Sequence, residues 1–249
     1  MNAGEHIAVL SENIRTLDDR AAELISVADI ESVLSANSEA LSKVRAQKAN
    51  REQGVLAHDD AARYYASRTA LYLNTHETAK IDESFLCELY GRLQNRAVPR
   101  ELMYRRDDMF VWQNNAAGES IAFVAVPGED VEAEMEKLFR EYSGEMTLYD
   151  ACRLPMDFMN IHPHPDMNGR VSRLLFETAL HKLGFRAAYL LPLEESICYN
   201  TKLYLQVLAA ANGRCYDAPK NYDIWVRYLL DKVALAYALL IHRLKMSAK

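Results

Sequence analysis

The sequence predicts a mostly α-helical protein with one small β-hairpin. Apolar residues recur at helical spacing through most of the 249 residues, as on the buried face of amphipathic helices. Glycine and proline are scarce, with nine and seven copies, and they mark breaks between the helical segments. Between residues 109 and 126 the pattern changes to short β-like runs.

The elements are expected in a simple order along the chain. Helices are predicted at residues 7–34, 59–74, 83–94, 130–142, 148–161, 169–183, 196–211 and 224–246. The runs at 109–112 and 121–126 are rich in β-branched and aromatic residues and predict a hairpin or flap. We expect two regions, a helical N-terminal region over residues 1–78 and a core with the C-terminal helices over residues 79–249.

Composition and charge exclude several classes of protein. The 29 basic and 35 acidic residues give a net charge of −6, whereas nucleic-acid binding requires a basic face. The most apolar stretch, residues 233–241, is too short to span a membrane, and the N-terminus lacks the apolar segment of a secretory signal peptide. We expect a cytoplasmic protein that binds neither nucleic acid nor membrane, with delivery into a host cell left open.

The segment that carries chemistry is residues 162–173, which read His-Pro-His-Pro-Asp-Met-Asn-Gly-Arg-Val-Ser-Arg. Pro163 and Pro165 keep its first half out of a helix, and an apolar stripe resumes at Val171. The pattern predicts a loop that leads into a helix N-terminus. Free backbone N–H groups and the helix dipole favour an anion at such a position.

Side chains suited to phosphate chemistry gather in this segment. Arg170 and Arg173 are spaced i, i+3, so they project as neighbours from one turn, and a guanidinium can bind phosphate through two parallel hydrogen bonds. Asp166 can hold a Mg²⁺ ion that bridges phosphate oxygens. His162 can take a proton near neutral pH. Together they predict phosphoryl or nucleotidyl transfer.

The segment resembles the signature of the Fic family, His-Pro-Phe-x-Asp/Glu-Gly-Asn-Gly-Arg-x-x-Arg. The matching positions are His162, Pro163, Asp166, Asn168, Gly169, Arg170 and Arg173. A weaker likeness extends over residues 80–230, where Tyr104-Arg105-Arg106 and the run 121–126 correspond to the flap of the family. Asn200 and Tyr204 resemble an Asn-xxx-Tyr element near the nucleotide. The resemblance implies the helical Fic fold with a hairpin flap.

The resemblance also implies an activity, the transfer of AMP from ATP to a Ser, Thr or Tyr hydroxyl of a target protein. His162 would be the base, and Asp166 would hold Mg²⁺. The nucleotide would be bound by residues on and near the loop, Asn168, Gly169, Arg170, Arg173, Asn200 and Tyr204. The target would be aligned by strand-like pairing with the flap residues Ile121, Phe123 and Val124.

Two positions depart from the family signature. His164 stands in place of a phenylalanine that anchors the loop in the core, and a buried imidazole needs a hydrogen-bond partner that phenylalanine does not. Met167 stands in place of a glycine beside the phosphates. Its Cβ disfavours a positive φ and crowds the approach to the backbone, so both departures bear on how the nucleotide lies.

An inhibitory helix is predicted near the N-terminus. Glu31 resembles the glutamate of the family's inhibitory motif, Ser/Thr-x-x-x-Glu-Gly/Asn, which pairs with the second arginine, here Arg173, and blocks the γ-phosphate. Val27 and Ser32 depart from that motif. The glutamate could act within one chain or across a homodimer, and the alternative is an acidic residue on a solvated helix face.

Other interpretations stay open at this point. His162, His164 and Asp166 also resemble the HxHxD opening of a metallohydrolase, which leaves the following Asn-Gly-Arg-x-x-Arg unexplained. The same site could remove AMP, with Glu31 orienting a water, or transfer another phosphoryl-linked group such as phosphocholine. Gly169 favours AMP transfer over kinase-like relatives, which carry lysine there. A non-catalytic scaffold that binds nucleotide is the third alternative.

Overall fold

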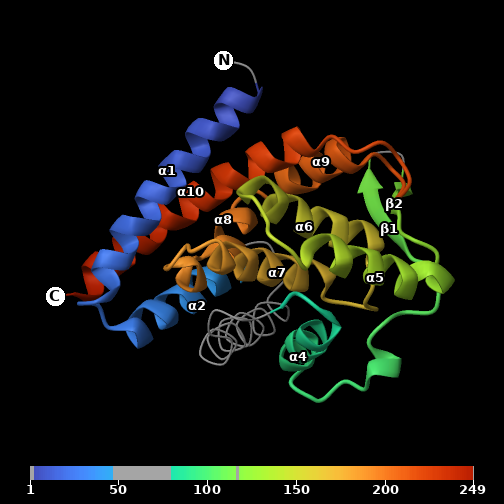
Figure 1. Cartoon of the computed structure of the whole chain (residues 1–249), viewed down its shortest axis with the longest axis horizontal. Coiled ribbons are helices and arrows are strands. Elements are labelled where there is room, and N and C mark those ends of the chain that lie inside the picture. The colour runs from blue at the N-terminus through green and yellow to red at the C-terminus, as the bar shows by residue number, and fades with distance from the viewer. Residues whose placement is uncertain (1–2, 47–79, 116–117, 249) are drawn as a thin grey trace. The chain divides into compact units, whose positions relative to one another are not determined.

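The computed structural model describes residues 3–46, 80–115 and 118–248 (Figure 1). Within these ranges the chain is mostly helical with a single two-stranded sheet, which confirms the predicted fold class. It forms two compact units, the first from residues 3–46, 177–201 and 227–248 and the second from residues 80–176 and 202–226. The predicted division at residue 78 stays a prediction.

The first unit consists of helices packed around buried polar contacts. Its helices are α1 (Ala3–Ile25), α2 (Ile30–Ala46), the end of α7 (Asn168–Lys182), α8 (Leu193–Cys198) and most of α10 (Tyr222–Ser247). α1 and α10 lie side by side (Figure 1), and the buried carboxylate of Asp18 joins them by accepting a hydrogen bond from the Tyr237 hydroxyl at 2.8 Å. Asp18 also accepts from the backbone N–H groups of Arg186 and Ala187.

Buried ion pairs attach α2 to the rest of the first unit. Arg45 of α2 lies 2.6 Å from a carboxylate oxygen of Glu194 in α8. Arg243 of α10 pairs with the buried Glu195 at 2.8 Å and donates to the side-chain oxygen of Asn37 in α2 at 2.6 Å. Breaking a buried pair costs about 3–5 kcal/mol, so these contacts hold α2 in one position against α8 and α10.

The second unit contains the flap and the predicted chemistry. Its elements are α4 (Glu83–Gln94), β1 (Phe110–Asn115), β2 (Gly118–Val124), α5 (Val131–Tyr142), α6 (Leu148–Ile161), the start of α7, and α9 (Thr201–Asn212). α6 begins with a capping box between Thr147 and Asp150, which satisfies N–H groups at the helix start. α6 packs against α5. Trp225, which belongs to residues 202–226 of the same unit, also holds α6 by donating to the Cys152 carbonyl at 2.7 Å.

The hairpin pairs β1 and β2 in antiparallel register, with Phe110 opposite Val124. On its outer edge β2 meets a third segment at Val124. The Val124 N–H donates to the Arg214 carbonyl, and the Val124 carbonyl accepts from the Tyr216 N–H, both at 2.9 Å. Both backbone groups on that edge of Val124 are therefore occupied.

Two predicted helices are each divided in the structure. The segment 7–34 breaks at residues 26–29 because the Asp29 side chain accepts hydrogen bonds from the N–H groups of Glu31 and Ser32 and so starts α2. The segment 196–211 breaks between α8 and α9, where Asn200 lies in a turn, a position that asparagine favours. The predicted helix at 59–74 lies outside the described residues, and no helix that is described has the length and apolar character to cross a membrane.

Candidate active site

Residues 162–167 form the loop between α6 and α7, as the prolines of the sequence predict. α6 ends at Ile161, and the next residue, His162, caps it with a left-handed φ of 53° and an N–H that donates to the Phe158 carbonyl at 2.9 Å. Met167, directly before α7, is left-handed too, with a φ of 71°. These two residues turn the chain sharply at each end of the loop, so the last turn of α6 is followed closely by the first turn of α7.

The imidazole of His162 is held in the state that a general base requires. Its Nδ1 lies 3.3 Å from the carbonyl oxygen of Met159, so this nitrogen donates and Nε2 keeps a lone pair. Burial lowers the pKa of His162 below its ordinary value, and the nearby charge of Arg105 acts in the same direction. The imidazole is therefore neutral at neutral pH and can accept a proton through Nε2.

A buried arginine holds the loop from inside the second unit. The guanidinium of Arg105 donates to four backbone carbonyls, those of Asp107, Val126, Ile161 and His162. Its backbone N–H donates to the Pro163 carbonyl at 2.8 Å. From the sequence, Arg105 is assigned only to the flap segment, since no spacing rule connects it to a loop so far along the chain. Arg105 thereby fixes the backbone at His162 and at the end of the flap.

His164 occupies the core position that the family gives to phenylalanine. It is fully buried, its ring stacks on that of Tyr90 with centroids 3.9 Å apart, and its Nδ1 lies 2.8 Å from the Met103 carbonyl oxygen. The imidazole thus anchors the loop as an aromatic ring would, with a partner for its N–H group. Burial lowers the pKa of His164 to about 4. Because this ring points into the core, the structure does not support the HxHxD metal site.

The side chain of Asn168 closes the loop on itself. Its Oδ1 accepts from the His164 N–H at 2.9 Å, and its Nδ2 donates to the His164 carbonyl at 2.7 Å. Asn168 is buried, so its amide acts as a positioning group. Any contact of Asn168 with phosphate is then a matter of its backbone N–H, because the first N–H groups of a helix lack intrahelical partners.

Charged side chains of the loop and of α7 itself lie around the N-terminus of α7. A Cβ built on Gly169 would lie 3.2 Å from a guanidinium nitrogen of Arg173, so this guanidinium lies over the first turn of the helix. Arg170 lies 3.9 Å from the Asp166 carboxylate. The Asp166 side chain is 79% exposed and accepts from the Met167 N–H at 2.6 Å.

This set of groups fits a nucleoside triphosphate with Mg²⁺. Magnesium at phosphate-transfer sites is bound through one or two carboxylates and the substrate phosphates, and Asp166 offers one exposed carboxylate beside two arginines. In the part of the chain that the structure describes, no cluster of three or more His, Cys, Asp or Glu side chains could bind a metal by protein ligands alone. Gly169 leaves room next to Arg173 that a Cβ would reduce.

The other predicted nucleotide and inhibitory residues lie away from this loop in the sequence. Tyr204 is buried in α9 with its ring edge-on to Trp225, 5.9 Å between centroids, so it packs in the core of the second unit. Asn200 and Glu31 are exposed and belong to the first unit. Their roles toward the nucleotide stay predictions.

The predicted docking residues of the flap lie on β2. Phe123 is paired with Val111 across the hairpin, and Val124 with Phe110. Ile121 is paired through its backbone with Trp112, while its side chain lies outside what the structure describes. The three residues therefore share one strand, as the sequence predicts, and the end of that strand leads to Val126 and the Arg105 contact.

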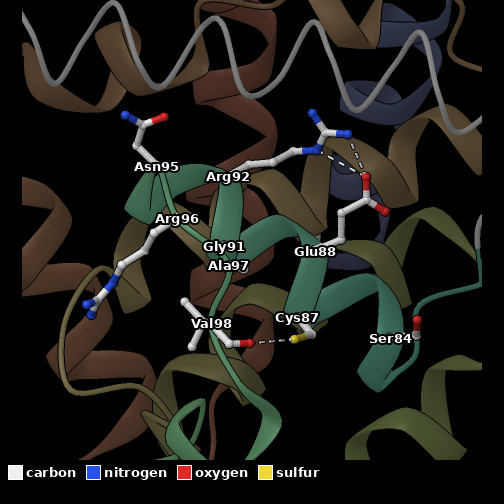
Figure 2. A pocket seen from close by; sticks show the side chains of 9 residues that line it. All are labelled: Ser84, Cys87, Glu88, Gly91, Arg92, Asn95, Arg96, Ala97 and Val98. Carbon is white, nitrogen blue, oxygen red and sulfur yellow. Dashed lines mark hydrogen bonds and ion pairs between the residues drawn. The ribbon is translucent and has the colours of Figure 1, made fainter.

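A separate hollow lies along α4 and the turn that follows it, with a volume of about 520 Å³ (Figure 2). Arg92 and Glu88 form an ion pair at 2.7 Å on its wall, and Cys87 donates to the Val98 carbonyl. None of its lining residues is a predicted site residue. The hollow is thus distinct from the loop that carries the phosphate-binding groups.

Comparison with known families identifies the segment that contains the loop and the flap. The sequence model of the Fic/DOC family matches residues 80–180. Residues 80–180 are a Fic/DOC domain. The Fic/DOC domain includes α4, the hairpin, α5, α6 and most of α7. It therefore contains the candidate loop and the three residues that hold it, Arg105, His164 and Asn168. A comparison with curated proteins gave no match.

Solved structures share the fold over nearly the whole chain. A Fic family protein from Desulfovibrio desulfuricans is 21% identical with a TM-score of 0.68, over 94% of this chain and 73% of that one. A Fic domain-containing signaling protein from Bacteroides thetaiotaomicron is 18% identical with a TM-score of 0.64, over 94% and 98%. Fic-1 from C. elegans is 17% identical with a TM-score of 0.59, over 96% and 74%. At these identities the likeness concerns the fold alone.

The His164→Phe variant should lose an acid dependence of stability. In the unfolded chain His164 binds a proton below its ordinary pKa of 6.5, whereas in the folded state it stays neutral until its pKa of about 4. The free energy of unfolding therefore does not depend on this group above pH 6.5. Between pH 6.5 and pH 4 the free energy of unfolding falls by up to about 3 kcal/mol. Urea unfolding at pH 7.5 and 4.5 should show a smaller fall in the variant than in the wild type. An equal fall in both proteins would contradict the buried neutral imidazole.

The Met167→Gly variant should be more stable than the wild type. A side chain in the left-handed conformation costs about 1–2 kcal/mol, and glycine removes this cost while losing about 0.5–1 kcal/mol more backbone entropy on folding. We expect a net gain of roughly 0.5–1 kcal/mol in the free energy of unfolding, measured with urea. The control is Leu235→Gly, at a 38% exposed site in the interior of α10, which should lose at least about 1 kcal/mol. A loss in both variants would contradict strain at Met167.

Proposed function

We propose that this protein transfers AMP from ATP to a hydroxyl side chain of a target protein. The observation that carries the proposal is that one loop, fixed by Arg105, places a neutral base at the end of α6 and two guanidinium groups at the start of α7. The Fic/DOC family generally transfers nucleotide or phosphoryl groups, and Gly169 supports AMP as the group transferred. Both features agree with a site that acts by positioning and charge stabilisation.

In the proposed reaction the target hydroxyl gives its proton to Nε2 of His162 while its oxygen forms a bond to the α-phosphorus of ATP. The bond from that phosphorus to the oxygen that bridges to the β-phosphate breaks, and pyrophosphate leaves with the electron pair. Arg170, Arg173 and the N–H groups of α7 bind the phosphate oxygens and stabilise the charge that develops there. Asp166 would hold Mg²⁺, which neutralises phosphate charge when bound.

We further propose that the target aligns against the flap by strand pairing, in which backbone hydrogen bonds provide most of the affinity. The occupied edge at Val124 limits this pairing. A strand that adds to the outer edge of β2 can pair with residues before Val124 and then meets the segment of Arg214 and Tyr216. The target chain would therefore leave the flap at this point.

Glu31 is proposed as the inhibitor of the site, by pairing with Arg173 in the place of the γ-phosphate, within one chain or across a homodimer. Two features support this. Glu31 is exposed in the first turn of α2, and the ion pairs of Arg45 and Arg243 hold α2 rigidly in the first unit. A fixed and accessible carboxylate is what such an inhibitor requires.

Intact-mass spectrometry after incubation with ATP and Mg²⁺ tests the proposed activity. The Glu31→Gly variant should gain the mass of AMP by modifying itself, the wild type should gain little, and a Glu31→Gly, His162→Ala double variant should be slower by at least about a hundredfold because it lacks the base. No gain in any protein, with ATP still raising the thermal stability, would contradict AMP transfer. It would favour another donor such as a phosphocholine carrier, removal of AMP, or a non-catalytic scaffold.

The rate of AMP transfer should also report the pKa of His162. Because burial lowers this pKa below 6.5, the base stays neutral and active at a pH where an ordinary histidine is half protonated. Initial rates of the Glu31→Gly variant between pH 5 and 8 should be more than half of the maximum at pH 6.5 and should fall to half only below that pH. Half of the rate already lost at or above pH 6.5, in protein that circular dichroism shows to be folded, would contradict the assignment.

A further inference from the structure

A second cavity lies inside the second unit and is lined in part by the last residues of α6 before His162. It has a volume of about 220 Å³ and is bounded by α5, α6, the end of the flap and residues 216–222. Asn160 and Ile161, the two residues before His162, line it, and so does Val126 at the end of the flap. The cavity has no part in the phosphate chemistry described above, and no predicted site residue lines it.

Asn160 is the unusual residue of this cavity. It is only 6% exposed, yet its side-chain oxygen has no hydrogen-bond partner among the residues that the structure describes. Its backbone is fixed, because its carbonyl accepts from the Val126 N–H at 3.4 Å. Buried polar side chains are nearly always hydrogen-bonded, so an exception needs a reason. A ligand group in the cavity would provide the missing partner.

The carboxylates around the cavity are already paired. Asp157 accepts from the hydroxyls of Tyr142 at 2.5 Å and Tyr222 at 2.7 Å. Lys137 pairs with Glu134 on the cavity wall. A ligand therefore finds no unmatched carboxylate here, so the cavity offers no partner for a cationic group.

Lys220 adds one donor to those of Asn160. Its ammonium group donates to the carbonyls of Asn212 and Cys215, both at 3.2 Å, and an ammonium carries three N–H donors in all. Burial lowers the pKa of Lys220. A ligand that fits both residues must donate to the Asn160 oxygen and must accept from the Asn160 amide nitrogen and from Lys220. A carboxamide does both, whereas a carboxylate has no donor and an ammonium no acceptor.

We propose that this cavity is a subsite for the carboxamide side chain of an asparagine or glutamine of the target protein, close to the hydroxyl that is modified. The role in target recognition rests on the proposed AMP transfer. A volume of about 220 Å³ is below the roughly 300–1,000 Å³ of pockets that enclose a whole small molecule, so it suits one side chain. The carboxamide pairs with Asn160 through two parallel hydrogen bonds and accepts a third from Lys220.

The flap gives the target chain a route to the cavity. Tyr216 lines the cavity and donates its N–H to the Val124 carbonyl on the outer edge of β2. A target strand that pairs with β2 must end where this contact begins. The next target residues then lie at the rim of the cavity, where a side chain can enter beside Asn160.

Binding of a capped glutamine tests the subsite without ATP or turnover. The probe is N-acetylglutamine N-methylamide, whose only primary carboxamide is the side chain, titrated into the full-length protein while the side-chain NH₂ signals of Asn160 are followed by NMR. We expect a saturable shift with a dissociation constant of about 1 mM, as for a ligand of about a dozen non-hydrogen atoms. N-acetylleucine N-methylamide, of similar shape but without any primary carboxamide, should give none. No saturable shift with the glutamine probe, or equal shifts with both probes, would overturn the proposal.

Variants assign the binding to Asn160. Asn160→Leu keeps the shape of the side chain and should weaken the probe at least tenfold by ligand-observed NMR, with a Tm equal to or above that of the wild type because an unpaired buried amide is removed. Asn160→Asp, which lacks the amide donors, should weaken it likewise if Asn160→Leu fails to fold. The control is Tyr104→Phe, since Tyr104 is as buried as Asn160, also has a side-chain oxygen without a hydrogen-bond partner in the described parts of the chain, and does not line the cavity. Unchanged probe binding in the folded Asn160 variants would overturn the proposal.

A second measurement separates the subsite from the proposed activity. Peptides with one threonine and a glutamine at increasing distances from it are incubated with the Glu31→Gly variant, ATP and Mg²⁺. One spacing should be modified at least tenfold faster than the same peptide with leucine for glutamine. Equal rates would overturn the role in target recognition. If AMP is transferred neither to any peptide nor to the protein itself, the proposed function is contradicted, and so is the role of the cavity in target recognition. The probe titration would still decide whether the cavity binds a carboxamide.

Discussion

A helix that stops abruptly leaves its last carbonyl groups without partners, and at the end of α6 the buried guanidinium of Arg105 supplies them. The same cation reaches Val126, where the flap returns to the core, and Asp107, where it departs. Hydrogen bonds to a charged group stabilise by about 1.5–3 kcal/mol each, so the position of His162 depends on a buried side chain that lies far from it in the sequence. The positive charge also complements the negative end of the α6 dipole.

The two departures from the family signature show that the shape of the loop can be kept by different means. At His164 a stacked imidazole with a carbonyl partner replaces a purely apolar anchor. At Met167 the backbone takes a left-handed conformation without a glycine. Both are tolerated because Arg105 and the Asn168 amide determine the path of the backbone through several hydrogen bonds. A strained backbone conformation at one residue persists where several contacts fix the conformation of the residues around it.

Local signals made most of the fold predictable from the sequence. The helices at 83–94 and 148–161 have the predicted bounds, since periodicity and capping residues act within a few positions, and two prolines define the loop before α7. The helical periodicity of residues 7–34 does not reveal the break at Asp29, because that break depends on hydrogen bonds from one side chain to the backbone. The contacts of Arg105 and the unpaired amide of Asn160 depend on tertiary packing, and no pattern in one sequence predicts them.

The closed edge of β2 at Val124 bears on how the protein behaves in concentrated solution. An uncovered strand edge is a template for pairing with other copies of the chain, and long, flat edges favour aggregation. The segment of Arg214 and Tyr216 covers the end of β2 nearest the core, so an intruding strand cannot extend from the flap into the body of the domain. Any intermolecular strand pairing on this edge of β2 is thereby confined to the residues of the hairpin before Val124.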